Sequence, residues 1–182
     1  MEEDGFERED NMFGKGDFIV YGSTGVCEVK DVTTLDMKEV SKDRLYYILR
    51  PVREKESKIF APVDGNKTVF RAVLTREEAE SLIDDIPAIE ELWISSDKLR
   101  EEKYKETIRS CECRDWIRII KTLYLRGQER QAQGKRATAM DEKYLRLAKD
   151  NLYSELSLAL DIPKEEMEGF IADRIHETEL CR

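Results

Sequence analysis

The pattern of apolar and polar residues changes character near residue 75. Before that point, short runs rich in β-branched and aromatic residues alternate with polar stretches that favour turns, as is typical of strands in tight succession. The pattern predicts five strands, at residues 18–21, 26–32, 45–49, 58–62 and 68–71. Because a sheet of such short strands must curl to bury one face, we expect a small bent β-barrel.

After residue 75 the apolar residues recur at helical spacing. Thr75-Arg76-Glu77-Glu78 has the form of a capping box, which begins a helix expected to end near Asp84 or Asp85. Further helices are predicted at residues 96–110, 114–133, 138–160 and 163–177. Apolar stripes on two of them are expected to form core: Trp116, Ile119, Ile120, Leu123 and Tyr124 on one, and Tyr144, Leu147, Ala148, Leu152 and Leu156 on the next.

These patterns together predict an α+β protein, with a small N-terminal β-barrel followed by an all-α C-terminal helical domain. We divide the 182 residues into a disordered tail (1–11), a β domain (12–72), a linker helix region (73–95) and a helical domain (96–182). The start of the chain is acidic, and no run approaches the roughly 20 apolar residues of a membrane span. We therefore expect a cytoplasmic protein with no membrane partner.

Charge is distributed unevenly along the chain. The formal net charge is −9, yet residues 98–149 hold 15 Lys and Arg against 8 Asp and Glu, a local balance of +7 that leaves −16 for the remainder. Such asymmetry fits a basic binding face on an acidic protein, although solvated helix faces linked by ion pairs would give the same count.

The stretch Gly22-Ser23-Thr24-Gly25 separates the first two predicted strands and invites comparison with a phosphate-binding loop. Such a loop needs Lys and Ser or Thr directly after its last glycine, whereas Val26 follows here. A hairpin turn with glycines at positive φ is the better interpretation.

No catalytic arrangement is indicated elsewhere. The single histidine, His176, lies late in the chain, and the carboxylates follow helix-surface patterns. Cys111 and Cys113 form a C-x-C pair that could supply half of a zinc site or a redox pair, but no second pair has the spacing to complete it. The pair also suits a corner between two helices. We expect no enzyme activity, cofactor, metal or small-molecule substrate.

The residues resemble a known family. FGKGDFIVYGSTGVCEVKDV, the strand YYIL and the edge KIFAPV are similar to the N-terminal domain of CarD-like bacterial transcription regulators, which the transcription-repair coupling helicase shares. REEKYKETIRSCECRDWIRIIKTLYLR and TAMDEKYLRLAKDNLYSELSLAL are similar to the helical domain of CarD-type proteins, which the helicase lacks. The resemblance covers roughly residues 12–172.

The resemblance implies a Tudor-like β-barrel that docks on the β subunit of bacterial RNA polymerase. The positions that match the docking edge are Lys58, Ile59, Phe60 and Pro62, with Leu35 and Lys38 beyond the second strand. Relatives often have an arginine where this chain has Phe60, and a basic residue where it has Leu35. We therefore expect the contacts with the polymerase to differ from those of these relatives.

The resemblance also implies that the helical domain contacts promoter DNA at the upstream edge of the transcription bubble and modulates open-complex stability, largely without reading sequence. A wedge tryptophan usually stands about four residues before the Tyr-Lys of the first basic helix, where this chain has Arg100 before Tyr104-Lys105. Trp93 either serves as the wedge from a shifted segment or packs against the barrel. The candidate DNA-binding residues are Trp93, Arg100, Lys103, Lys105, Arg126, Arg130, Lys135, Arg136, Lys143 and Arg146.

Two alternatives remain open from the sequence. A protein-only adaptor with a β-barrel reader would show its cations on different faces, and a zinc or thiol switch would use Cys111 and Cys113.

Overall fold

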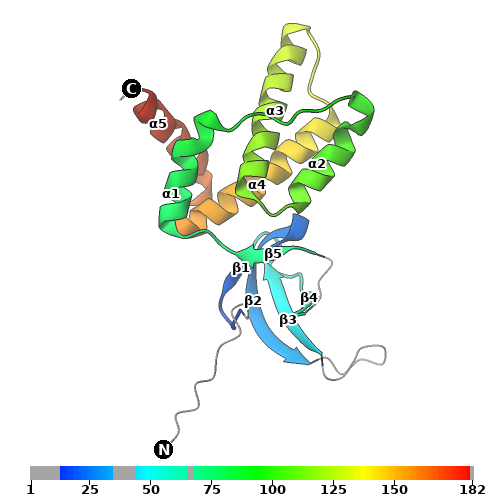
Figure 1. The fold of residues 1–182 in the computed structure, drawn as a ribbon, viewed down its shortest axis with the longest axis vertical. Helices are drawn as coiled ribbons and strands as arrows, with labels where there is room; N and C mark the ends of the chain where they lie inside the picture. The colour runs from blue at the N-terminus through cyan, green and yellow to red at the C-terminus, as the bar shows by residue number, and fades with distance from the viewer. Residues whose placement is uncertain (1–12, 35–43, 65–67, 181–182) are drawn as a thin grey trace, which may run out of the picture.

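The computed structural model describes residues 13–34, 44–64 and 68–180, in which a β-sheet lies at one end of the molecule and a group of helices at the other (Figure 1). The predicted tail at residues 1–11 lies outside the described residues. The strands are β1 (Phe18–Tyr21), β2 (Gly25–Thr34), β3 (Leu45–Pro51), β4 (Ile59–Pro62) and β5 (Phe70–Ala72). All five predicted strands are therefore present.

The sheet has the order β4-β3-β2-β1-β5, and every neighbouring pair is antiparallel. The register between β2 and β3 shifts between Val29 and Asp31, and such a bulge strengthens the local bend of a strand. Within the described residues, β4 and β5 do not pair with each other. The fold class is confirmed, but the predicted barrel is a curved sheet with two open edges, because the strand at each end is only three or four residues long.

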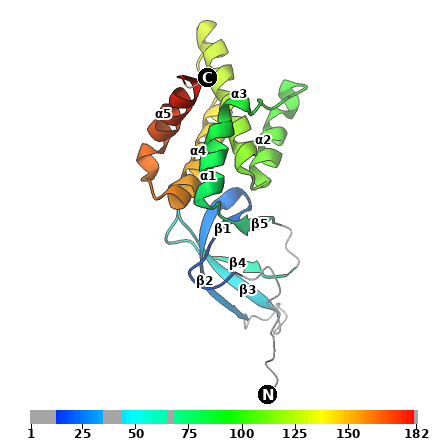
Figure 2. The ribbon, with the colours of Figure 1, turned by 60° about the vertical axis from the view of Figure 1, so that its left-hand side comes forward.

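The helices are α1 (Arg76–Asp85), α2 (Arg100–Arg109), α3 (Cys113–Ala132), α4 (Ala139–Leu160) and α5 (Met167–Leu180). The predicted capping box begins α1: the Glu78 amide donates to Thr75 Oγ1 at 3.2 Å, and the Thr75 amide donates to Glu78 Oε2 at 2.8 Å. Helices α1 and α5 lie side by side (Figure 2). In the part of the chain that the structure describes, none of the helices has both the length and the apolar character needed to cross a bilayer.

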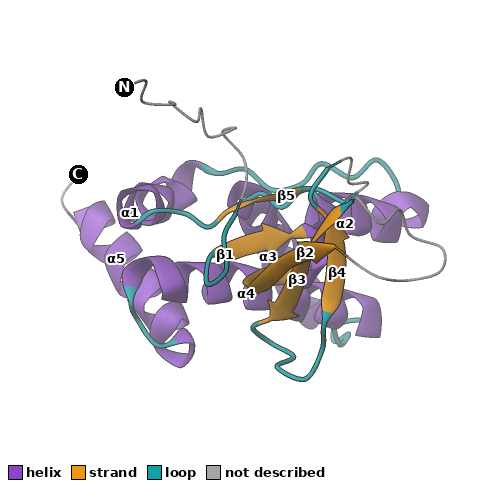
Figure 3. Cartoon of the chain, turned by 90° about the horizontal axis from the view of Figure 1, so that it is seen from below, coloured by secondary structure: helices purple, strands orange, loops and turns teal. Residues whose placement is uncertain are grey.

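The hairpin of β1 and β2 is buried on both faces. Ile19 and Cys27 pack inside the sheet with Tyr47, whereas Val20 and Val26, on the opposite face, pack into the core of the helices. Figure 3 shows the sheet from below with the helices behind it. The near-continuous apolar pattern of this hairpin therefore reflects two cores that share one pair of strands.

The stretch Gly22–Thr24 is a single 3-10 turn that links β1 to β2, as the hairpin interpretation predicts. Gly25 follows it with φ +81°, a backbone conformation that residues other than glycine rarely adopt. A Cβ atom on Gly25 would lie 2.6 Å from Asn151 Oδ1 of α4. This glycine therefore lets the turn approach the helical layer closely.

The predicted stripe on α3 is correct except at its end. Trp116 and Ile119 are fully buried and Leu123 is nearly so, but Tyr124 is 63% exposed. Each residue turns the helix by about 100°, which carries Tyr124 away from the face that Leu123 buries. On α4, Tyr144, Ala148, Leu152 and Leu156 are buried as expected.

Candidate functional site

The outer edge of the sheet at β4 carries an exposed aromatic side chain. Phe60 is 47% exposed, whereas its neighbour Ala61 is fully buried in the sheet core. Phe60 lies opposite Ile48 of β3, and Pro62 lies opposite Tyr46. Because directly opposite residues of antiparallel strands share one face of the sheet, Phe60 and Ile48 form a small apolar surface beside the edge.

An edge strand of this kind can accept a partner strand. One side of β4 pairs with β3, and its other side pairs with no strand among the described residues. Backbone groups along such an edge can bind an extended segment, while side chains such as Phe60 fix its register. Lys58 is exposed and Ile59 is half-buried at the same edge.

Two of the predicted docking residues, Leu35 and Lys38, lie outside the described residues. Ile48 was not predicted. Its place beside Phe60 depends on the register of β3 against β4, and the sequence alone does not determine that register.

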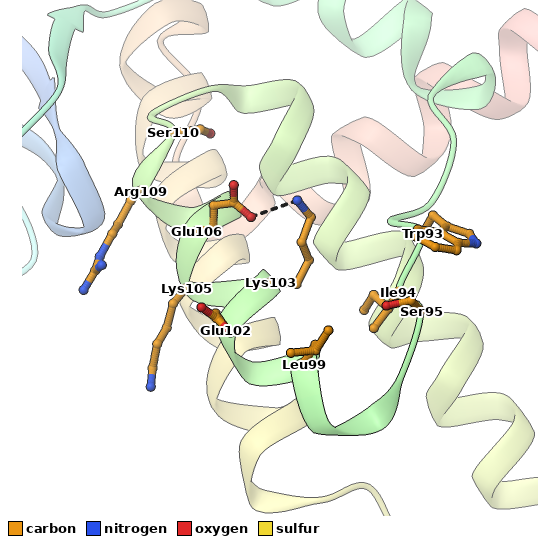
Figure 4. Close-up of a pocket in the computed structure, with 10 residues that line it drawn as sticks. All are labelled: Trp93, Ile94, Ser95, Leu99, Glu102, Lys103, Lys105, Glu106, Arg109 and Ser110. Atoms are coloured by element: carbon orange, nitrogen blue, oxygen red, sulfur yellow. Dashed lines mark hydrogen bonds and ion pairs between the residues drawn. The ribbon is translucent and has the colours of Figure 1, made fainter.

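A groove of about 920 Å³ lies between α2 and the segment that precedes it (Figure 4). Trp93 stands on that segment and is 80% exposed, so it does not pack against the sheet. Lys103 extends from α2 on the side of the groove that faces Trp93, whereas Lys105 and Arg109 extend from the other side of the helix (Figure 4). The groove therefore combines an exposed indole with cations on two sides of α2.

The side chain of Arg100 makes its polar contacts within the protein. Its side chain is only 14% exposed and donates to Asp97 Oδ1 at 2.6 and 2.9 Å and to Tyr104 Oη at 3.3 Å. These contacts fix the beginning of α2, so Arg100 is held within the protein and Trp93 is the exposed aromatic residue beside this helix.

Most of the predicted cations have partners within the protein. Lys103 pairs with Glu106 at 2.8 Å and Lys105 with Glu101 at 3.1 Å, and these exposed pairs on α2 are weak enough to exchange for phosphate. Arg126 is different, because it pairs at 3.0 Å with Asp141, whose side chain is only 7% exposed. Arg126 therefore stabilises the packing of α3 on α4.

The remaining predicted cations lie around the connection of α3 to α4 and along α4. Arg130 donates to the Arg136 carbonyl at 2.8 Å, Lys135 donates to Gln133 Oε1 at 3.0 Å, and the Lys143 ammonium lies 5.1 Å from the centre of the Tyr144 ring. Arg136 and Arg146 are exposed and form no ion pair with any described residue.

Asp97 connects the cations of α2 with those of α3. Hydrogen bonds from Arg100, with Arg126 and Arg130 nearby, hold the pKa of Asp97 below its usual range. The basic residues of these two helices thus approach one another at the beginning of α2. Arg109, at the other end of α2, lines the groove with Trp93, is exposed and has no ion pair in the described ranges. The sequence signal for Arg109 was its place four residues after Lys105, one helical turn away.

Cys111 and Cys113 face the interior. Cys111 donates to the Val69 carbonyl at 3.2 Å, and Cys113 donates to Glu155 Oε2 at 3.0 Å. Burial raises the pKa of Cys111 to about 11, and burial followed by the Glu155 charge raises the pKa of Cys113 well above its usual range. Among the described residues, no three His, Cys, Asp or Glu side chains are grouped to hold a metal ion. Both thiols lie at the corner between α2 and α3 and act there as hydrogen-bond donors.

Two family models match the chain. Residues 13–73 match the CarD-like/TRCF RID domain, and residues 93–172 match the CarD C-terminal domain. The first match covers the whole sheet, and the second covers α2, α3, α4 and the beginning of α5. No curated protein matches the chain significantly.

Proposed function

The chain belongs to the CarD family of transcription proteins that interact with RNA polymerase, and on this premise we propose a two-contact mechanism. The β4 edge binds the β subunit of the polymerase, and the helical layer binds promoter DNA with Trp93 as a wedge. The wedge slows closure of the bubble and thereby lengthens the life of the open complex. The family is non-catalytic, and none of these steps requires a reaction.

The exposure of Trp93 is the observation that carries this proposal. The Trp93 side chain is 80% exposed to solvent. Its insertion between base pairs in a distorted minor groove would remove apolar surface from water, which is favourable. Lys103, Lys105 and Arg109 lie around the same groove and can neutralise the adjoining phosphates. A wedge of this kind needs no base-specific hydrogen bonds, which suits action at many promoters.

The proposed polymerase contact rests on the β4 edge. Addition of a strand supplies backbone hydrogen bonds whatever the sequence of the partner. At the position where relatives often have an arginine, which would contribute a charged contact, Phe60 contributes an apolar one. We therefore expect the complementary surface on the β subunit to be apolar where it meets Phe60.

Retention of the β subunit by the immobilised full-length protein tests this contact. We expect Phe60→Glu to reduce retention at least tenfold, because it places a charge in an apolar contact. Leu158→Glu is the matched control, since Leu158 is 40% exposed on α4, away from the sheet edge. Equal retention of the two variants would contradict the docking edge.

The lifetime of open complexes after challenge with a competitor tests the DNA contact. We expect the protein to lengthen this lifetime and Trp93→Ala to abolish most of the effect. Tyr124→Ala is the matched control, because Tyr124 is also an exposed aromatic residue but lies outside the Trp93 groove. A Trp93→Ala variant that is as effective as the parent would contradict the wedge.

A further inference from the structure

Trp93 stands on an irregular segment between α1 and α2, where no regular hydrogen-bonding pattern fixes its backbone. Its indole forms no hydrogen bond with any described residue. A side chain can keep base pairs apart only if the backbone that carries it is held in place, so another part of the protein must fix this segment. The contacts from α3 meet that need.

The hydroxyl of Thr122 on α3 holds the residue directly before the tryptophan. The Leu92 amide donates to Thr122 Oγ1 at 2.8 Å, while Thr122 Oγ1 donates its own proton to the Arg118 carbonyl at 2.7 Å. Because the single hydroxyl proton is committed to Arg118, a lone pair is turned toward the Leu92 amide. This geometry fixes the hydroxyl as an acceptor.

A second tether comes from the neighbouring residue of α3. The Lys121 ammonium donates to the Ile89 carbonyl at 2.6 Å and to the Pro87 carbonyl at 3.3 Å. The side chains of Ile89 and Leu92 are 8% and 6% exposed, so apolar burial and polar tethers act on the same segment. Trp93 follows directly and turns outward.

We propose that Thr122, assisted by Lys121, is a positioning residue that holds Trp93 in a defined place across the groove from α2. This inference rests on the proposed function of Trp93. It explains how a tryptophan that lies before α2, outside any helix, is held in one position. The tethers come from α3, so the wedge is supported by the core of the helical layer.

Thr122→Val tests the proposal because it keeps the shape of the side chain and removes the acceptor. We compare the change in the logarithm of the open-complex lifetime. The change caused by Thr122→Val should be at least half of the change caused by Trp93→Ala. Thr122→Ser keeps the hydroxyl and should restore the parent lifetime. Binding to the polymerase β subunit and the affinity for closed duplex DNA should remain within twofold of the parent, since neither requires the indole to be held in one position.

The double variant Trp93→Ala/Thr122→Val separates positioning from a general structural effect. If Thr122 acts through Trp93, the double variant should have the lifetime of Trp93→Ala alone. Additive losses, or a parent-like Thr122→Val, would overturn the positioning role. An unchanged lifetime for Trp93→Ala alone would instead refute the proposed wedge, so the two failures are distinguishable.

Discussion

The guanidinium of Arg71 on β5 and the carboxylate of Glu155 on α4 form an ion pair through two oxygens, at 2.6 and 3.0 Å. Glu155 is fully buried, and its Oε1 atom also accepts a hydrogen bond from the Leu74 amide at 2.9 Å. Arg71 further donates to the Cys111 carbonyl at 2.8 Å. The pair therefore joins β5 of the sheet to α4, to the corner between α2 and α3 and to the segment before α1.

Removal of one partner of this pair should strongly destabilise the protein. Glu155→Ala removes the charged partner of the Arg71 guanidinium and the acceptor of the Leu74 amide, and we expect a loss of about 3–5 kcal/mol in the free energy of unfolding. Urea denaturation measures this loss. Glu168→Ala is the control, because Glu168 pairs with Lys149 at 2.6 Å but its side chain is 66% exposed, so its loss should cost about 0–1 kcal/mol. Similar losses in the two variants would contradict a structural role for the buried pair.

The turn after β1 gives a second stability test. Gly25→Ala introduces a methyl group where Asn151 lies 2.6 Å away and where φ is positive, so we expect a loss of about 1–3 kcal/mol. Gly127→Ala is the matched substitution within α3, where a Cβ meets no atom within 4 Å, and it should stabilise the protein by about 0.5–1 kcal/mol. Thermal unfolding of the two variants should shift in opposite directions, and a Gly25→Ala protein as stable as the parent would contradict the close approach of α4.

Local signals in the sequence were sufficient for most of the fold. The capping box at Thr75 needs only residues within one helical turn, and the hairpin at Gly22–Thr24 needs only a turn between two apolar runs. Such features depend on neighbours along the chain, which the sequence displays directly.

Contacts between residues that are distant in the sequence could not be predicted from such local signals. The burial of Arg100 depends on Asp97 and on the hydroxyl of Tyr104, and the structural role of Arg126 depends on Asp141 in another helix. Charge counts cannot distinguish a cation that pairs internally from one that remains exposed. The same limit applies to Ile48, whose closeness to Phe60 is a consequence of strand register.

The salt dependence of DNA binding should separate phosphate contacts from structural cations. Lys105→Gln and Arg109→Gln should each reduce the slope of log affinity against log salt by about 0.9, because one fewer counterion is released. Arg126→Gln should instead lower the unfolding temperature, since it leaves the buried Asp141 carboxylate without its partner. Titrations of duplex DNA between 50 and 200 mM salt measure the slopes. Unchanged slopes for both Lys105→Gln and Arg109→Gln would remove them from the DNA interface.

The buried Cys113 thiol should make stability depend on alkaline pH. Its pKa is 9.0 when unperturbed and is raised in the folded protein, chiefly by burial and then by the charge of Glu155. The folded state keeps this proton above pH 9 while the unfolded state loses it, so the stabilising contribution is complete below pH 9 and falls as pH rises further. One such group contributes a slope of about 1 kcal/mol per pH unit.

Urea denaturation of the parent and of Cys113→Ala at pH 8, 9 and 10 measures this contribution. We expect the variant to be less stable at pH 8, because it leaves a cavity beside Glu155, but to lose less stability than the parent between pH 9 and 10. Thr107→Ala is the control: Thr107 is also buried and donates to the Lys103 carbonyl at 2.7 Å, yet it does not titrate. If Cys113→Ala and Thr107→Ala show the same fall with pH as the parent, the thiol does not carry the alkaline dependence, and the protons must come from other buried groups such as Cys111, whose pKa is raised to about 11.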